Sequence, residues 1–498
     1  MTSIRTAAAV GSAPASRDRV PWPAWVIGAV FVAVELAFSG RYGFQQDELY
    51  FVVAGRHPAF GYVDQPPLAP LLTRTTGLLG VDPAAIRILP ALAGGAVVVI
   101  AARTAALFGA GRTGRTLAAL ATATAPVLVG ACHIGNTTPY DLLAWAVVVW
   151  CVATAQLRER PRWWLGAGAA AGLGLQNEYL VVLAVGALVV GLLTDPAQRA
   201  VPATRWPWAG GALALALWAP NLVWQARHGW PQLAMAGALH AQNTSTGDYL
   251  VGLPGQLLYA GVLGVPLAVA GVGRLWRTAE LRFLAVAVTL VVLYVLAWVP
   301  GKVYYTDGLL PLVLGAGAAS AEHWVQRSRG ERVVVAVCAT LGVLVNVLTL
   351  PLVPVASLHR SVQEHTVTDT VGWPQLTAQV VRLDAELRRS GEAPTAVFTG
   401  SYAEAGALQL FGGRDRLPPV LSAHNNYWLW GPGTASDRTV LTVDAAARLR
   451  PYFADCRRLA VFNPPDQVQN DWNDLPIDVC TGPKAPWTAL WPRLRHYD

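Results

Sequence analysis

The feature that most constrains this chain is a series of long apolar segments in its first two thirds. A helix needs roughly 20 mainly apolar residues to cross the hydrocarbon core of a bilayer. Eleven segments approach this length and composition: 23–40, 86–108, 116–131, 139–156, 163–177, 179–194, 207–224, 249–272, 282–299, 304–320 and 332–354. The sequence therefore predicts a mainly α-helical, polytopic membrane domain over residues 23–356, with about eleven transmembrane helices.

The composition agrees with a chain that is solvated mostly by lipid. Hydrophobic residues make up 54% of the 498 residues and charged residues 13%, whereas soluble proteins carry about 25% charged residues. The net charge of +7 does not require a nucleic-acid partner, because positive charge collects in the cytoplasmic loops of membrane proteins. We therefore expect a lipid bilayer as partner and no nucleic acid.

The distribution of positive charge predicts the orientation. If residues 1–22 form a cytoplasmic tail before an uncleaved first helix, every short inside loop carries at least two arginines. The outside loops and their edges then hold Arg41, Arg56, Arg74, Arg87, Arg227 and Lys302. The positive-inside rule fits this phase. It predicts a multi-pass plasma-membrane protein with residues 357–498 outside the cell.

Two outside stretches have patterns of their own. In residues 41–85, apolar and polar residues alternate at helical spacing, which predicts two amphipathic helices in the membrane interface, the second opened by Pro66 and Pro67. Residues 357–498 mix strand-like runs, such as TAVFTG and TVLTV, with helix-like ones. They predict a small extracytoplasmic α/β domain. Cys456 and Cys480, 24 residues apart, could form a disulfide there.

Several acids lie where this topology places the outer membrane surface. Asp47 and Glu48 follow the first span, where a carboxylate can act as a general base or be an ordinary solvated charge. Asp64 precedes two prolines and could cap a helix or take part in chemistry. Asp141 begins the fourth span, where a helix dipole or a function would stabilise it. Glu178, between two spans, is either a cavity residue or the tip of a hairpin, and the spacing favours the tip.

Cationic groups share this face. Lys302 stands beside Tyr304 and Tyr305, a pattern typical of an aromatic interface belt but also suited to a phosphate site. Arg56, Arg74 and His133 are further outside cations or titratable groups; the histidines show no metal-ligand spacing. Acids and cations together beside interface helices would suit a lipid-linked anionic substrate.

Three segments carry a resemblance to a known family: QDELYFVVAGRHPAFGYVDQPPLAPLL, TTPYDLLAW and KVYYTDGLLPLVLGAGA. They resemble the GT-C superfamily of membrane glycosyltransferases, in the branch of the protein O-mannosyltransferases and the lipid A aminoarabinose transferases. The tail segment SYAEAGALQLFGG…LPPVLSAHNNYWLWGP resembles actinobacterial members. The resemblance implies a polyprenyl-phosphate-linked sugar donor. It also implies a glycan, lipid or protein acceptor on the outer face, and inversion at the anomeric carbon.

The resemblance also implies roles for individual residues. Asp47 would activate the acceptor hydroxyl and Glu48 would support it. Asp64 and Asp141 would be further acids of the site, and Lys302, Tyr304 and Tyr305 would line the lipid-phosphate pocket. Gln65 and Glu178 depart from the family pattern, in which lysines are common. Three explanations stay open: Arg56, Arg74, His133 or Lys302 supplies the positive charge, which is the preferred one; a divalent metal ion is held by Asp47, Asp64 and Asp141; or the donor differs or activity is lost.

Two other functions stay open from the residues. A sugar or lipid transporter or flippase would usually show paired internal repeats and sites near the membrane midplane, and the sequence shows neither. A non-catalytic relative that binds lipid or sugar is the other alternative. Mannose, arabinose and other sugars are each compatible with the pattern.

Overall fold

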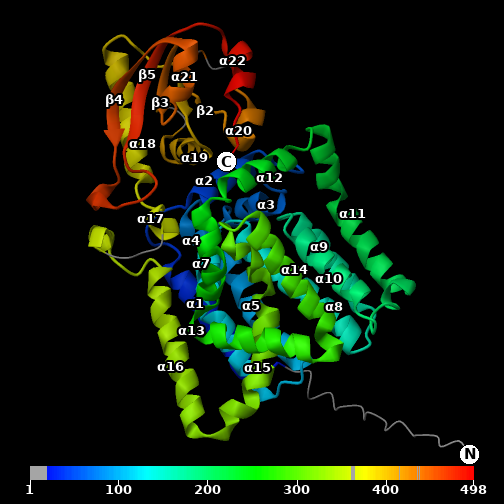
Figure 1. The fold of residues 1–498 in the computed structure, drawn as a ribbon. Coiled ribbons are helices and arrows are strands. Elements are labelled where there is room, and N and C mark those ends of the chain that lie inside the picture. Colours follow the sequence, from blue (N-terminus) through cyan, green and yellow to red (C-terminus); the bar gives the residue numbers. More distant parts are fainter. Residues whose placement is uncertain (1–19, 361–364, 414–415, 434–435, 437, 498) are drawn as a thin grey trace, which may run out of the picture.

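The computed structural model describes residues 20–360, 365–413, 416–433, 436 and 438–497. A helical membrane domain carries, at one end, a domain built around a β-sheet (Figure 1). All but the last three residues of the predicted cytoplasmic tail lie outside the described residues.

Most helices of the membrane domain coincide with apolar segments of the sequence. In chain order they are α1 (Trp22–Phe38), α2 (Gln46–Arg56), α3 (Leu68–Thr76), α4 (Pro83–Ile86), α5 (Ile88–Leu107), α6 (Arg112–Ala123), α7 (Pro126–Cys132), α8 (Thr138–Leu157), α9 (Trp163–Leu175), α10 (Val181–Thr194), α11 (Arg205–Arg227), α12 (Pro231–Gln242), α13 (Thr246–Arg277), α14 (Arg282–Trp298), α15 (Leu310–Arg327) and α16 (Arg329–Val345). A 3₁₀ segment, η4 (Val303–Leu309), precedes α15.

Five helical stretches of the described chain are long and apolar enough to span a membrane: Pro83–Leu107, Thr138–Leu157, Thr246–Arg277, Ala279–Trp298 and Arg329–Leu348. A sixth span results if α6 and α7, which meet at an angle of 57°, are counted together. Helices α1 and α10 are apolar but shorter. The protein is therefore a multi-pass membrane protein.

The eleven predicted spans can be compared with these helices one by one. Each falls on a helix or on the α6–α7 pair, so the mainly α-helical fold is confirmed. The segments predicted at 163–177, 207–224 and 304–320 correspond to α9, α11 and η4–α15, which do not meet the length and hydropathy expected of a full span. Of the last, residues 304–309 are 3₁₀ rather than α-helical.

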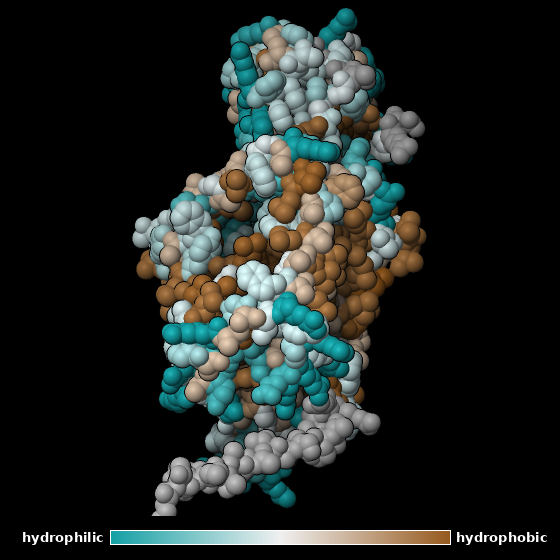
Figure 2. Space-filling view, turned by 90° about the vertical axis from the view of Figure 1, so that its right-hand side faces the viewer, coloured by the Kyte–Doolittle hydropathy of each residue, from teal (hydrophilic) through white to brown (hydrophobic). Residues whose placement is uncertain are grey.

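The surface of the membrane domain agrees with a lipid environment. Figure 2 shows an apolar region at mid-height, between the hydrophilic C-terminal domain and a hydrophilic opposite end. Helix α16 and the first half of α13 present many exposed apolar side chains, for example Val343 and Leu250. Exposed apolar side chains of this density are stable where lipid replaces water.

The loop at 41–85 forms the two predicted helices, α2 and α3, and Pro66 and Pro67 directly precede the second. The prediction that both are amphipathic surface helices is wrong for α2. Residues 48–55 are all buried, because α2 packs between α3 and helix α19 (Tyr402–Phe411) of the C-terminal domain. The pattern misled because a helix covered on all sides needs no polar face.

The C-terminal domain is a small α/β unit, as predicted. Its five-stranded sheet has the order β2-β1-β3-β5-β4, in which β1 is parallel to β2 and β3, and β5 is antiparallel to β3 and β4. The strands are β1 (Ala396–Thr399), β2 (Val420–Ser422), β3 (Thr439–Val443), β4 (Phe453–Phe462) and β5 (Leu475–Pro483). The connecting helices are α17 (His365–Thr368), α18 (Trp373–Arg389), α20 (Asn425–Trp430), α21 (Ala446–Leu449) and α22 (Trp487–Leu494), together with α19.

Alternating strand residues bury both faces of this sheet. Val397 and Leu441 face α18, α19 and Leu49 of α2, whereas Phe398 and Val440 face α21 and α22. The first of these cores is thus shared with the membrane domain. Cys456 and Cys480 lie opposite each other on β4 and β5 and form a disulfide, as the sequence had suggested.

Candidate active site

A cavity of about 510 Å³ lies between the membrane domain and the C-terminal domain. Its walls come from the loop before α2, the start of α2, the turn between α7 and α8, helices α12 and α13, and η4. The C-terminal domain adds residues from α17, α19 and α20. The titratable residues that line it are Arg41, Tyr42, Asp47, Tyr50, Asp64, Arg87, His133, Glu178, Tyr259, Lys302, Tyr304, Tyr305 and Tyr402.

Asp47 stands in the first turn of α2 and is half-buried at the cavity wall. Gln45 and Glu48 fix the start of this helix through a capping box, which uses up the free N–H groups there. The hydroxyl of Tyr402 donates to Asp47 Oδ1 at 2.9 Å. Burial raises the pKa of Asp47, while hydrogen bonds from Tyr402 and Asn136 and the charge of Lys302 counteract part of the rise.

Asp64 lines the same cavity, but it does not cap α3, whose N-cap residue is Pro67. Tyr50 donates to Asp64 Oδ1 at 2.8 Å and Asn425 to Oδ2 at 3.2 Å. With its amide oriented to satisfy both groups, Gln65 donates to Asp64 Oδ1 at 2.6 Å. The amide group of Gln65 therefore hydrogen-bonds to Asp64 rather than to an anionic ligand.

The pKa of Asp64 predicts how stability depends on pH. Burial raises this pKa to about 7, from about 3.9 in an unfolded chain. Between these values the folded state holds a proton that the unfolded state has lost, so stability falls as pH rises from about 4 to about 7. We expect the thermal unfolding temperature in detergent to drop over this range. Asp64→Asn should flatten the drop, and the exposed Asp466→Asn should not; equal slopes in wild type and Asp64→Asn would contradict the assignment.

Glu48, next to Asp47 in the sequence, points into the protein instead of the cavity. It is fully buried and accepts from Arg87 Nε at 2.7 Å and Nη2 at 2.8 Å, as well as from the backbone N–H of Gly135 at 2.8 Å. Arg87 also donates to the carbonyls of Ser39 and Gly43. This bidentate pair therefore ties α2 to the loop before it and to the turn after α7.

Lys302, at the start of η4, is the cation best placed to meet an anion in the cavity. No described residue forms a hydrogen bond or an ion pair with its ammonium group. By contrast, the guanidinium group of Arg87 binds Glu48 and backbone carbonyls, and that of Arg41 donates to the carbonyls of Pro351 and Leu352. Burial lowers the pKa of Lys302, and the charge of Asp47 opposes that change. An anionic ligand would offset the same desolvation.

Comparison with known proteins agrees with this architecture. The family of dolichyl-phosphate-mannose-protein mannosyltransferases matches residues 64–224, and no curated protein sequence matches the chain significantly. The structure is similar to ArnT from Cupriavidus metallidurans bound to undecaprenyl phosphate, with a TM-score of 0.57 and 17% identity over 91% of this chain and 97% of that one. The mycobacterial arabinofuranosyltransferase AftD gives a TM-score of 0.50 and 16% identity over 94% of this chain and 42% of that one.

The chain therefore has a fold similar to that of ArnT. At these sequence identities the structural likeness establishes the fold, and the family match covers the cavity-lining stretch from Asp64 to Glu178.

Most residues predicted for the site do meet in this cavity. Asp47, Asp64, Lys302, Tyr304 and Tyr305 all line it. The rings of Tyr304 and Tyr305 meet edge to face with their centroids 5.0 Å apart. His133 also lines the cavity, but its Nδ1 lies 3.1 Å from Glu35 Oε2 and its Nε2 3.5 Å from Arg87. His133 is therefore engaged by the protein itself.

Three predicted substrate-binding residues do not line the cavity. Arg56 and Arg74 border a separate hollow of about 320 Å³ between α2 and α3. Arg56 lies nine residues after Asp47, which is about 14 Å along a helix, so the two cannot face one small ligand group. Asp141 is buried in the first turn of α8.

The cavity also contains residues that sequence reasoning missed or placed elsewhere. Glu178 is not a solvated hairpin tip: it faces the cavity, and burial raises its pKa to about 7. Tyr402 and Asn425 come from the tail segments SYAEAG and HNNY. The capping box at Ser401 and Glu404 could have located the start of a helix in the sequence. It could not have shown that this helix packs on α2.

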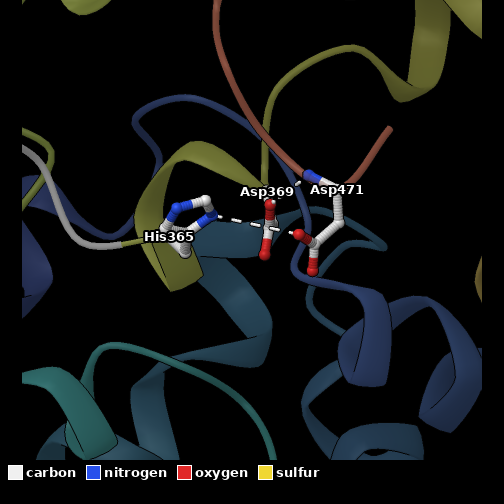
Figure 3. Close-up of side chains that lie close together, drawn as sticks. All are labelled: His365, Asp369 and Asp471. Atoms are coloured by element: carbon white, nitrogen blue, oxygen red, sulfur yellow. Dashed lines mark hydrogen bonds and ion pairs between the residues drawn. The ribbon is translucent and has the colours of Figure 1, made fainter. Parts of the chain in front are cut away.

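The predicted metal ligands do not come together. Among the described residues, the group of three potential ligands that could hold an ion is His365, Asp369 and Asp471 (Figure 3). His365 and Asp471 are 76% and 65% exposed and lie 3.9 Å apart. None of the three lines the cavity, although their neighbours Thr366 and Thr370 do. Asp47, Asp64 and Asp141 form no such group, because Asp141 lies outside the cavity.

Proposed function

We propose that this protein is a membrane glycosyltransferase that moves a sugar from a polyprenyl-phosphate donor to an acceptor hydroxyl. The observation that carries the proposal is that a half-buried carboxylate, Asp47, and a cation with no ion-pair partner among the described residues, Lys302, line one cavity between the membrane and C-terminal domains. The GT-C fold supports it, since ArnT of this fold was solved with undecaprenyl phosphate. We further propose that the donor and the acceptor meet on the extracytoplasmic face.

In the proposed reaction, the acceptor oxygen attacks the anomeric carbon of the donor. The acceptor proton passes to Asp47, a new C–O bond forms, and the bond between the anomeric carbon and the phosphate oxygen breaks. The electron pair of that bond leaves with the polyprenyl phosphate. A single displacement of this kind inverts the anomeric configuration. A carboxylate whose pKa is raised towards neutrality accepts a proton more readily than an ordinary one.

The leaving phosphate gains negative charge as the bond breaks, so fixed cations and hydroxyl donors beside it lower the barrier. Lys302 supplies the charge in this proposal. The hydroxyls of Tyr304 and Tyr305, which also line the cavity, supply hydrogen bonds. The two positions at which the family pattern commonly has lysine, Gln65 and Glu178, offer no positive charge to the phosphate.

Lys302→Met should therefore weaken binding of undecaprenyl phosphate. A hydrogen bond to a charged group is worth about 1.5–3 kcal/mol, which corresponds to a loss of roughly tenfold to hundredfold in affinity. The other lysine of the chain, Lys484, is exposed and bonds to the carbonyl of Pro451 in the C-terminal domain, so Lys484→Met is a matched control. Binding can be measured by microscale thermophoresis in detergent. Equal affinities in both variants would remove Lys302 from the site.

The activity itself can be tested with purified protein in liposomes and a panel of labelled polyprenyl-phosphate sugars, including mannose and arabinose donors. Glycan, lipid and protein acceptors are offered in turn. Transfer of label to one acceptor supports the proposal. Movement of the labelled lipid across the bilayer without any transfer would favour a flippase instead, and binding without transfer or movement would favour a non-catalytic lipid-binding protein.

A further inference from the structure

The C-terminal domain reaches the cavity through helix α19, which lies against α2 along a close contact. A Cβ atom added at Gly406 of α19 would lie 3.0 Å from the Cβ of Leu49 and 3.1 Å from its carbonyl carbon. Backbones approach this closely only where a glycine leaves room. The contact therefore fixes the distance between the start of α19 and the start of α2.

This fixed distance places Tyr402 beside Asp47. Tyr402 is the first residue of α19, and its own helix start is held by the capping box of Ser401 and Glu404. Its hydroxyl donates to Asp47 Oδ1 at 2.9 Å. A carboxylate with one oxygen held in this way has its second oxygen, Oδ2, held in direction as well.

A parallel arrangement holds Asp64. Its Oδ2 accepts from Asn425 Nδ2 of the C-terminal domain, and its Oδ1 accepts from Tyr50 of α2. The rings of Tyr50 and Tyr402 lie 4.8 Å apart, and the ring of Tyr427 lies 6.3 Å from that of Tyr50. Aromatic pairs at this spacing add about 0.5–1.5 kcal/mol beyond the area they bury. The two acids are thus held by one aromatic cluster that spans both domains.

We propose that the C-terminal domain completes the active site, with Tyr402 as the positioning residue that aims Asp47 at the acceptor hydroxyl and Asn425 as the positioning residue for Asp64. The inference rests on the function proposed above and adds a requirement to it: both domains must be docked for the carboxylates to be in place. A C-terminal domain that merely covered the cavity would need no hydrogen bonds to Asp47 and Asp64.

The groups that surround Asp47 define what a pH profile would report. Tyr402 faces it from α19, Asn136 from the turn before α8, Lys302 from the start of η4, and Glu48 from α2 itself. Asp47 and Asp64 also interact electrostatically, since the charge of Asp47 raises the pKa of Asp64. Loss of the Tyr402 hydroxyl removes a hydrogen bond that favours the ionised form of Asp47, and the other groups stay in place.

The test compares Tyr402→Phe with wild type in the liposome transfer assay, with kcat, KM and kcat/KM measured across pH. We expect kcat to fall about tenfold to hundredfold, because small misplacements of a reacting group carry costs of that order. The KM for the donor should stay near the wild-type value. The acid limb of kcat/KM should move to higher pH. Tyr452→Phe, a half-buried tyrosine of the same domain outside the cavity, should change none of these quantities.

A second variant perturbs the position of Asp47 without changing Tyr402. Gly406→Val forces α19 away from α2, so the acid limb should move in the same direction although the Tyr402 hydroxyl is intact. Undecaprenyl phosphate binding, measured on both variants, shows that the membrane domain is folded. If wild type is active and neither variant moves kcat or the acid limb, the role of the C-terminal domain is overturned and the proposed function stands. If wild type transfers no sugar from any donor, the proposed function itself fails.

Discussion

Asp47→Asn is expected to lower the rate of sugar transfer by about 10²–10⁴-fold, the range that a positioned general base contributes. The asparagine side chain has the same shape, and its oxygen can still accept the hydrogen bond from Tyr402. It cannot accept the acceptor's proton at neutral pH. Single-turnover transfer, measured with donor and acceptor both in excess of their dissociation constants, isolates this chemical step from binding.

Donor binding supplies the internal control for this variant. Asp47 is a negative charge close enough to Lys302 to affect its pKa, so its removal should leave the affinity for undecaprenyl phosphate unchanged or raise it. Asp466→Asn, an exposed carboxylate in the C-terminal domain, should retain both transfer and binding. Transfer by Asp47→Asn within threefold of wild type would rule out Asp47 as the base.

Arg87→Leu is expected to destabilise the folded protein by about 3–5 kcal/mol, because it leaves the buried carboxylate of Glu48 without a counter-charge. The side chain of Arg87 is 2% exposed and that of Glu48 is fully buried. The same substitution also leaves the carbonyls of Ser39 and Gly43 without a donor. Thermal unfolding in detergent, followed by intrinsic tryptophan fluorescence, measures the loss.

A double substitution separates this effect from simple loss of packing. Arg87→Leu combined with Glu48→Leu removes both charges, so it should recover a substantial part of the lost stability. Arg162→Leu removes an exposed arginine at the start of α9 and should lie within about 0.5 kcal/mol of wild type. A double variant that is as unstable as Arg87→Leu alone would show that the buried charge is not the cause.

Asp47 and Glu48 are neighbours in the sequence but have different surroundings, because they lie on different sides of helix α2. Successive residues of an α-helix point about 100° apart. Asp47 therefore faces the cavity while Glu48 faces Arg87 in the interior. The sequence pair DE suggested a shared role. In the structure, Glu48 fixes the start of α2, the helix that carries Asp47, through its capping box and its ion pair.

Much of the membrane domain could be predicted from the sequence, because the bilayer imposes length and apolarity directly on each segment. The apolar run at 139–156, for example, became α8 (Thr138–Leu157). The short segments were less predictable. The run at 116–131 is broken at Thr124 and Ala125 into two helices, and the first residues of the run at 304–320 wind as a 3₁₀ segment. The first break lies directly before Pro126, which disfavours helical backbone at Ala125.

The residues of the site also differ in how well the sequence predicted them. The DE pair, Asp64 and the Lys302–Tyr305 segment stood out by residue type, since charged groups beside apolar spans are costly and need a reason to be there. Arg56 and Arg74 stood out equally and proved to border a different hollow. Residue type identifies candidates, but it carries no information on which helix face meets which loop.

The sequence by itself determined that this chain crosses a membrane many times, that it ends in a small α/β domain, and that carboxylates and a lysine gather near one membrane surface. These properties depend on composition and spacing along a single segment. The tertiary structure alone decided which carboxylate meets the cavity and which is buried against Arg87. It also decided that Tyr402 and Asn425, more than 350 residues away in sequence, reach the two acids. Such contacts arise from the docking of two domains, which no local pattern encodes.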